Sequence, residues 1–319
     1  MANDTPPIVL CFGVSDPTSA SGIQADLLTL ASMGCHGVTV LTGYAVRDSA
    51  GTDEMTALDP EVVASQARML LEDMPIAAFK VGATLRAEIA SAIAEVVADY
   101  DDVPLILSPD FTMDDEHVLS ADELRESVAE LLAPQTTLLV ADASAIAQLA
   151  QPDPDAESPS HEDAIGHLLS HGCEYVLAMD VSTNQMINTL YSEDGQVRQD
   201  AWERSPNRVL GVNDTLAAAI CALLANGIDA PEAVREAQEY LFQASRNAFR
   251  PGMGGYVPDR FFWAKVDPEQ EEGEGSGEGE SESEGPKEGP AGRDADEPSD
   301  SDPDLRASGR DVGHGDALH

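Results

Sequence analysis

The segment Gly211-Val212-Asn213-Asp214-Thr215 combines the residue types that a phosphoryl-transfer centre requires. It opens the apolar run 215–225, which predicts a helix that stops at Asn226-Gly227. A helix N-terminus presents unpaired N–H groups and the positive end of the helix dipole, so it holds anions. Asp214 could accept the proton of an attacking hydroxyl group. In an alternative interpretation without chemistry, Asp214 or Asn213 only caps the helix.

A second polar stretch, residues 13–27, joins the apolar run 8–12 to a predicted helix at 22–33. It reads G-V-S-D-P-T-S-A-S-G-I-Q-A-D-L. This stretch resembles the pattern G-S-D-P-S-G-G-A-G-I-Q-A-D-L of the hydroxymethylpyrimidine/phosphomethylpyrimidine kinase family, which belongs to the ribokinase-like superfamily. The resemblance covers about residues 7–260 and continues through the segments Met33–Gly37, Phe79–Gly82, Gly211–Thr215 and Gly254–Pro258.

The resemblance implies a three-layer α/β/α ribokinase-like fold around a mostly parallel sheet. It implies ATP with Mg²⁺ as phosphoryl donor. The acceptors would be the hydroxymethyl group of 4-amino-5-hydroxymethyl-2-methylpyrimidine and then its phosphate, in thiamine biosynthesis. It also implies a possible homodimer. The family's functional positions correspond here to Gly211, Asn213 and Asp214 for catalysis, to Gly13, Asp26, Arg47, Ala83 and Asp110 around the substrate, and to Asp142, Asp180 and Thr215 around the nucleotide.

This sequence departs from the family pattern at the reaction centre and at the substrate positions. Asp214 stands where the family has cysteine, and Asn213 stands where it has a second glycine. Aspartate preserves base chemistry, and asparagine tolerates a left-handed turn. Arg47 replaces a glutamine, Ala83 replaces a methionine, and Asp110 ends a Ser-Pro-Asp run where the family has D-P-V. The substrate pocket is therefore expected to differ in charge and shape, with Arg47 facing Asp110 or an anionic substrate. In an alternative interpretation without function, Arg47 points outward from a surface loop.

The nucleotide positions depart further. Asp142 replaces the asparagine of a T-P-N-x-x-E motif, and Ala145 replaces its glutamate. The family's K-G-G-H aligns with residues 178–181, so a lysine is lost and Asp180 adds a negative charge. Carboxylates near phosphates weaken nucleotide binding unless a metal ion bridges them. Two alternatives therefore stay open: a catalytically degenerate homologue that acts as a ligand-sensing or partner-binding module, and a kinase for another small hydroxylated substrate, such as a pyridoxal-like ring.

The elements that must position these residues alternate between strands and helices. Continuously apolar runs predict strands that are buried on both faces, as in a parallel sheet covered by helices. One hairpin is expected, because the turn sequence Glu193-Asp194-Gly195 separates residues 188–192 from 196–202. The expected strands are 8–12, 37–44, 77–81, 105–107, 137–141 and 175–179, and the expected helices are 22–33, 60–71, 86–98, 121–132, 144–150, 161–170, 215–225 and 231–246.

Composition divides the chain and excludes some classes of function. Residues 266–319 hold 18 acidic and four basic residues and no aromatic residue, so we expect an acidic, disordered tail. Residues 7–265 would form the kinase domain, and 1–6 an N-terminal extension. A net charge of −42 with only three lysines suggests a halophilic source and disfavours nucleic-acid binding. No signal peptide or membrane span is recognised, so a cytoplasmic location is expected. No metal-ligand motif is recognised either. The acidic run Asp114-Asp115-Glu116 is expected to be a solvated loop, with a lid as the alternative.

Overall fold

The computed structural model of the 319-residue chain describes residues 5–111, 121–151, 159–181 and 185–265. The expectations for the N-terminal residues 1–4, for the acidic run 114–116 and for the tail 266–319 lie outside the described residues. No described helix has both the length and the apolar character that crossing a membrane requires.

The described strands form one nine-stranded sheet in the order β3-β2-β1-β4-β5-β6-β7-β8-β9. The strands are β1 (Ile8–Ser15), β2 (His36–Arg47), β3 (Thr52–Ala57), β4 (Ile76–Val81), β5 (Leu105–Leu107), β6 (Leu138–Asp142), β7 (Tyr175–Val181), β8 (Gln185–Ser192) and β9 (Gly195–Glu203). The six strands from β2 to β7 along this order pair in parallel, and β3, β8 and β9 are antiparallel to their neighbours.

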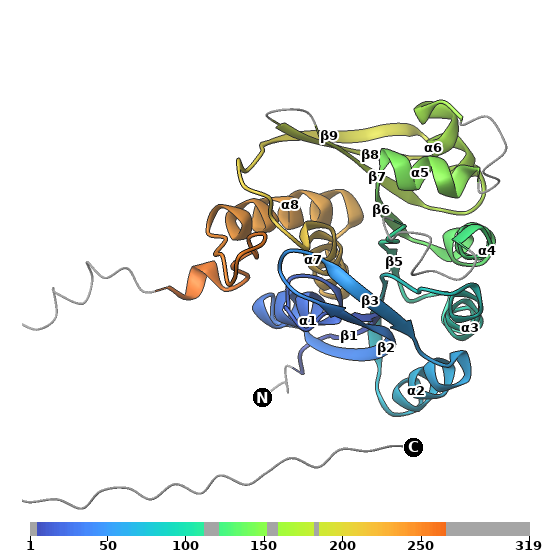
Figure 1. The fold of residues 1–319 in the computed structure, drawn as a ribbon. Helices are drawn as coiled ribbons and strands as arrows, with labels where there is room; N and C mark the ends of the chain where they lie inside the picture. Colours follow the sequence, from blue (N-terminus) through green and yellow to red (C-terminus); the bar gives the residue numbers. More distant parts are fainter. Residues whose placement is uncertain (1–4, 112–120, 152–158, 182–184, 266–319) are drawn as a thin grey trace, which may run out of the picture. The chain divides into compact units, whose positions relative to one another are not determined.

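Helices cover both faces of the sheet, which confirms the expected α/β/α layers (Figure 1). The helices are α1 (Gly22–Ser32), α2 (Pro60–Asp73), α3 (Ala87–Val97), α4 (Ala121–Ser127), α5 (Ala143–Ala150), α6 (His161–Ser170), α7 (Val212–Ala225) and α8 (Ala230–Arg246). A π-helical turn, Val128–Leu132, continues α4. One apolar core lies between the sheet and α2 to α6, and a second lies between the sheet and α1, α7 and α8.

The prediction of a single hairpin was wrong, because β2 and β3 form a second one. Asp48 closes its turn by accepting hydrogen bonds from the backbone N–H groups of Ala50 and Gly51. Strand β3 carries Thr-Asp-Glu-Met-Thr-Ala and lies at the edge of the sheet, so burial imposes no apolar pattern on it. The hairpin extends β2 to Arg47, beyond the predicted end at residue 44.

The strand order reverses direction at β1, since the chain places β2 on one side of β1 and β4 on the other. Ligands of open parallel sheets bind in the crevice outside the carboxyl ends of the strands at such a switch point. The segment that resembles the kinase family follows the carboxyl end of β1, and α7 packs on α1 and β4 nearby. The fold therefore brings residues 13–22 and 211–215 to one edge of the sheet.

Candidate active site

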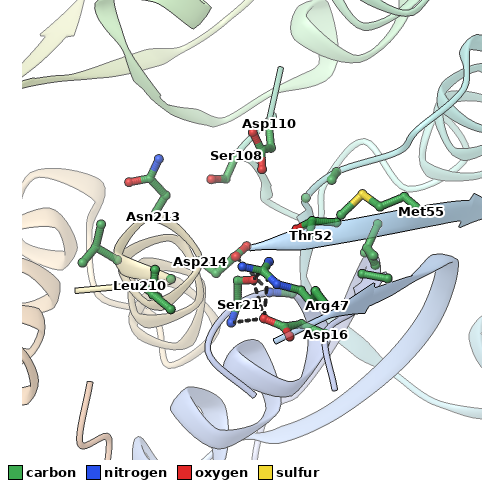
Figure 2. A pocket seen from close by; sticks show the side chains of 18 of the residues that line it. Asp16, Ser21, Arg47, Thr52, Met55, Ser108, Asp110, Leu210, Asn213 and Asp214 are labelled. Atoms are coloured by element: carbon green, nitrogen blue, oxygen red, sulfur yellow. Dashed lines mark hydrogen bonds and ion pairs between the residues drawn. The ribbon is translucent and has the colours of Figure 1, made fainter. Parts of the chain in front are cut away.

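Asp214 lines a pocket of about 590 Å³ at this edge, which we call the Asp214 pocket. Its walls come from the ends of β1, β2, β4 and β5, from β3, and from the start of α7. Among the predicted residues it is lined by Gly13, Arg47, Ala83, Asp110, Gly211, Asn213 and Asp214. Figure 2 shows Ser108 and Asp110 on one side of this pocket and the group of Asp16, Ser21 and Arg47 on another.

Helix α7 begins one turn earlier than the sequence predicts. Gly211 is its N-cap and adopts a left-handed backbone with φ of 65°. A Cβ at this position would lie 1.7 Å from the carbonyl oxygen of Ala20, so only glycine fits the turn. Asp214 is therefore in the first helical turn, and the alternative that Asp214 or Asn213 is the cap was wrong. The first N–H groups of α7 are left without helical acceptors at the pocket.

Asp214 belongs to a buried cluster with Asp26 and Lys80, which we call the Lys80 cluster. The Nζ of Lys80 donates to Oδ1 of Asp26 and to Oδ1 of Asp214, each at 2.7 Å. The side chain of Lys80 is 1% exposed and that of Asp214 is 21% exposed. The backbone N–H of Gly22 donates to the other oxygen of Asp214 at 2.9 Å. The carboxylate of Asp214 is therefore held between α1, β4 and the pocket.

The charges of this cluster set the pKa values of both carboxyl groups. Burial opposes ionisation of Asp214, but the Lys80 ammonium and the Gly22 N–H hold the pKa of Asp214 below its usual value. Burial dominates at Asp26 and raises its pKa to about 7, although Lys80 counteracts this. Burial would lower the pKa of Lys80, but the two carboxylates raise it instead, so Lys80 stays protonated. Asp214 is thus an ionised carboxylate at neutral pH.

Two predicted site residues lie beneath the pocket rather than in its wall. Asp26 was expected around the substrate, but it is fully buried and is not among the lining residues. Within the described part of the chain, its Oδ2 has no hydrogen-bond partner. Thr215 was expected at the nucleotide, but it is also fully buried, and its hydroxyl donates to the carbonyl oxygen of Gly211. Neither side chain lines the pocket. Asp26 instead accepts a hydrogen bond from Lys80, and Thr215 donates one to Gly211, so each contacts a residue of the site.

Arg47 lies in the pocket wall with Ser21 and Asp16. Its Nη1 donates to Oγ of Ser21 at 3.2 Å and lies 3.6 Å from Oδ2 of Asp16. Burial opposes ionisation of Asp16, but hydrogen bonds from Ser21 and Thr18 outweigh it and lower the pKa of Asp16. The Nε of Arg47 is buried, and none of the residues that the structure describes accepts a hydrogen bond from it. An unsatisfied buried donor is costly, so Arg47 is suited to a ligand that offers an acceptor.

A second cavity of about 1240 Å³ adjoins the first at the start of α7, and we call it the Trp202 cavity. The two share Arg208, Val209, Val212 and Asn213 in their walls. Its floor and sides come from β8, β9 and α8, with Trp202 and Phe242 in contact at a ring-centroid distance of 5.3 Å. The two cavities meet at the N-terminus of α7, a type of helix end that binds anions. A molecule bound in one cavity can therefore pass an anionic group to a molecule bound in the other.

The predicted nucleotide residues divide between the Trp202 cavity and the surface. Asp142 lines the cavity, where its Oδ1 also accepts from the backbone N–H of Ala145 and caps α5. Asp180 is exposed on β7 and is not among the residues that line either cavity. A degenerate homologue would have the cleft beside residues 142 and 180 filled by side chains. A cavity is open beside Asp142, whereas Asp180 lines neither cavity.

Several residues at the site were not singled out from the sequence. Lys80 could have been found, since a lysine inside the apolar run Ala-Ala-Phe-Lys-Val must be paired when it is buried. Arg260 is 3% exposed, and its guanidinium donates to the carbonyl oxygens of Ser19 and Ala20 and to Oγ1 of Thr215. It ties α7 to the segment after β1. No local signal in the sequence indicates such long-range contacts.

Comparisons with known proteins agree with this geometry. The family model described as "Phosphomethylpyrimidine kinase" matches residues 16–259. A hydroxymethylpyrimidine/phosphomethylpyrimidine kinase of Streptomyces coelicolor is 33% identical over 273 residues, which cover 82% of this chain and 96% of the relative. The Escherichia coli kinase of the same name is 27% identical over 259 residues, covering 80% of this chain and 97% of the relative.

Solved structures share the fold at lower identity. A pyridoxal kinase from Staphylococcus aureus, solved in complex with pyridoxal, superposes with a TM-score of 0.72 at 23% identity, covering 82% of this chain and 96% of the other. A phosphomethylpyrimidine kinase from Clostridium difficile has a TM-score of 0.60 at 22% identity, covering 76% and 100%. These similarities establish the ribokinase-like type of fold.

Proposed function

Since this chain belongs to the phosphomethylpyrimidine kinase family, we propose that it transfers the γ-phosphoryl group of ATP to 4-amino-5-hydroxymethyl-2-methylpyrimidine and to its phosphate. The observation that carries this proposal is the position of Asp214. It is a carboxylate, ionised by Lys80, in the first turn of α7, where the Asp214 pocket adjoins the Trp202 cavity. A base and an anion-binding helix end at one point are the two requirements of transfer to a hydroxyl group.

In the proposed reaction the pyrimidine occupies the Asp214 pocket and ATP occupies the Trp202 cavity. The hydroxyl oxygen of the substrate forms a bond to the γ-phosphorus as the bond from that phosphorus to the β,γ-bridging oxygen breaks and ADP leaves. Asp214 accepts the hydroxyl proton. The first N–H groups of α7 donate hydrogen bonds to the oxygens of the transferred group, which carry its negative charge.

The residues around the Trp202 cavity fit a nucleotide with a divalent cation. Arg204 and Arg208 line the cavity, and their side chains form no hydrogen bond or ion pair with the described residues. They supply positive charge to a cavity whose wall lacks the family's lysine. Asp142 is the carboxylate that would hold Mg²⁺, an oxygen-preferring cation that shields phosphate charge when it is bound.

In this proposal Arg47 supplies the positive charge beside the molecule that receives the phosphoryl group in the Asp214 pocket. Its unsatisfied Nε suits an acceptor atom of the pyrimidine ring or an oxygen of the substrate phosphate. Transfer to a phosphate needs such a charge, because acceptor and donor are both anions. A pyridoxal-like substrate is the second candidate, because Asp214 and Arg47 would also suit another small hydroxylated ring and because the fold is shared with pyridoxal kinases. A homodimer and a cytoplasmic location remain predictions.

The test measures ADP release with Mg-ATP and each acceptor in turn: the hydroxymethylpyrimidine, its phosphate and pyridoxal. We expect turnover with the pyrimidines and a loss of kcat of about 10²- to 10⁴-fold in Asp214→Asn, with nucleotide binding retained. The matched control is Asp180→Asn, which removes an equal charge outside both cavities. Turnover with pyridoxal but with neither pyrimidine would contradict the proposed substrate. Full activity of Asp214→Asn would contradict the role of Asp214 as the general base.

A further inference from the structure

The Trp202 cavity contains a buried hydrogen-bond acceptor without a partner. Asn188, on β8, lines the cavity and is 1% exposed. Its Oδ1 has no hydrogen-bond partner among the described residues. A buried acceptor left unpaired costs about 1–3 kcal/mol, so an unpaired amide oxygen on a residue that lines a cavity points to a ligand that donates a hydrogen bond to it.

A chain of side chains sets the orientation of the Asn188 amide. The indole N–H of Trp202 can only donate, and it donates to Oε1 of Gln238 at 3.1 Å. The carboxylate of Asp200 can only accept, and Nε2 of Gln238 donates to it at 2.9 Å. Gln238 therefore cannot be turned around. Its Oε1 also accepts from Nδ2 of Asn188 at 2.7 Å, so Asn188 must present Oδ1 rather than Nδ2 elsewhere.

Asp200, at the start of this series of hydrogen-bonded side chains, is itself held in place. Asp200 forms a two-point ion pair with Arg198, at 2.7 Å and 2.8 Å. This pairing and the hydrogen bond from Gln238 lower the pKa of Asp200, so it stays an acceptor at neutral pH. The ion pair between Arg198 and Asp200 consequently determines which atom donates and which accepts in each hydrogen bond from Asp200 to Asn188.

The surroundings of Asn188 suit a flat heteroaromatic ring. Trp202, Phe242, Leu241 and Met186 line the same cavity. The phosphate end of a nucleotide would lie at the other side, where Asn213 and Arg208 belong to both cavities. The base of the nucleotide is therefore expected between β8, β9 and α8.

We propose that Oδ1 of Asn188 accepts a hydrogen bond from the exocyclic amino group of the nucleotide base and thereby selects adenine over 6-oxo purines. This inference rests on the proposed function and adds the residue that chooses the phosphoryl donor. A 6-oxo group would face Oδ1 acceptor to acceptor, and Gln238 prevents the amide from turning to offer Nδ2 instead.

The experiment compares ADP with inosine diphosphate, which has an oxo group in place of the 6-amino group. Binding to the full chain is followed by calorimetry, or by tryptophan fluorescence with Trp263→Phe as the background so that Trp202 alone reports. We expect ADP to bind at least tenfold more tightly than inosine diphosphate. In Asn188→Leu the two affinities should differ by less than threefold, mainly because ADP binding weakens.

Two further variants separate selection from simple structural damage. Thr189→Val is the matched control, since Thr189 is the next residue of β8, is also buried and does not line the cavity. It should keep the preference for ADP. Gln238→Leu frees the Asn188 amide to turn, so inosine diphosphate should bind more tightly than it does to the unaltered chain. A merely structural role of Gln238 would not produce that gain.

The outcomes distinguish this inference from the function on which it rests. If neither nucleotide binds the unaltered chain, the proposed kinase function is overturned together with the inference. If ADP binds but the two nucleotides bind equally, the function stands and the selection by Asn188 is wrong. The same conclusion follows if folded Asn188→Leu, with an unchanged melting temperature, retains the tenfold preference.

Discussion

Asp214 differs from an isolated general base because both of its oxygens already accept hydrogen bonds, from Lys80 and from Gly22. A carboxylate offers about four acceptor positions, so a substrate hydroxyl can still bind. The same contacts lower the basicity of Asp214. A loose phosphoryl-transfer transition state demands little basicity, since positioning and charge stabilisation provide most of the rate. Lys80 therefore acts as a positioning residue that keeps Asp214 ionised and oriented.

Replacing Lys80 by methionine removes the charge that holds the pKa of Asp214 low. A carboxylate with a lowered pKa is ionised above that pKa and loses its charge as the pH falls through it. Without Lys80 the pKa of Asp214 rises, because only the Gly22 N–H and the Arg260 guanidinium are then left to oppose the effect of burial. We expect the acid limb of the profile of kcat/KM against pH to shift to higher pH by about one pH unit or more. The measurement is a pH–rate profile between pH 4 and pH 9.

The control for this variant is Lys265→Met, because Lys265 pairs with Asp259 at the surface and lies outside both cavities. The double variant Lys80→Met, Asp26→Asn guards against misfolding, since it removes the carboxyl group that would otherwise be buried without its partner. An acid limb that stays in place in a folded variant would contradict the role of Lys80.

At the scale of elements, the sequence predicted what burial and helix periodicity control. The apolar strands β1, β4, β5 and β6 and the helices from α1 to α8 were all expected, with ends that differ by a few residues. Strand β3 was missed, because an exposed edge strand has no apolar pattern to recognise. The start of α7 was misplaced, because Gly211 in a left-handed conformation already begins the turn.

The candidate site was predictable only where neighbouring residues carry it. The segments 13–22 and 211–215 are local motifs, and the fold brings them together at one edge of the sheet. Lys80, Arg260 and Asn188 were not singled out, because their roles arise from partners 50 or more residues away. Asp26 and Thr215 were assigned to ligands by resemblance, but the structure buries them under the pocket.

The turn at Gly211 is the element on which the site depends most. In Gly211→Ala a Cβ would collide with the backbone of Ala20, and the left-handed conformation adds about 1 kcal/mol of strain. We expect a loss of about 3 kcal/mol or more in the free energy of unfolding, together with a loss of activity. Denaturant titration and the kinase assay measure the two effects.

Gly227 provides the matched control at the opposite end of the same helix. It is also left-handed, with φ of 82°, but a Cβ there would meet nothing within 4 Å. Gly227→Ala should therefore cost only about 1 kcal/mol and leave kcat unchanged. Equal losses in the two variants would show that backbone strain, rather than the close approach to Ala20, limits the turn.

At the scale of the whole molecule, negative charge is largely uncompensated. The chain carries 59 acidic residues against 17 lysines and arginines. Of its three lysines, Lys80 is buried, Lys265 pairs with Asp259, and Lys287 lies outside the described residues. A net charge of −42 destabilises any compact state through self-repulsion. The halophilic source expected from the composition remains a prediction, and its physical basis is that salt would relieve this repulsion.

The resulting prediction concerns stability against salt. The Debye length falls from about 10 Å at 0.1 M to about 3 Å at 1 M, so added KCl screens the repulsion. We expect the melting temperature to rise with KCl, with most of the gain below about 1 M. Sulfate at equal ionic strength distinguishes screening, which depends on ionic strength, from the exclusion of salt from the surface, which favours sulfate.

A chain that ends at Lys265 identifies the source of the repulsion. It lacks the 18 acidic and four basic residues of the C-terminal segment, so its net charge is about −28. If charges throughout the chain repel one another, the melting temperature of the shorter chain should still rise with KCl, but by less than that of the full chain. A melting temperature that is independent of KCl in both chains would contradict the charge argument, and the acidic composition would then need an explanation other than stability in salt.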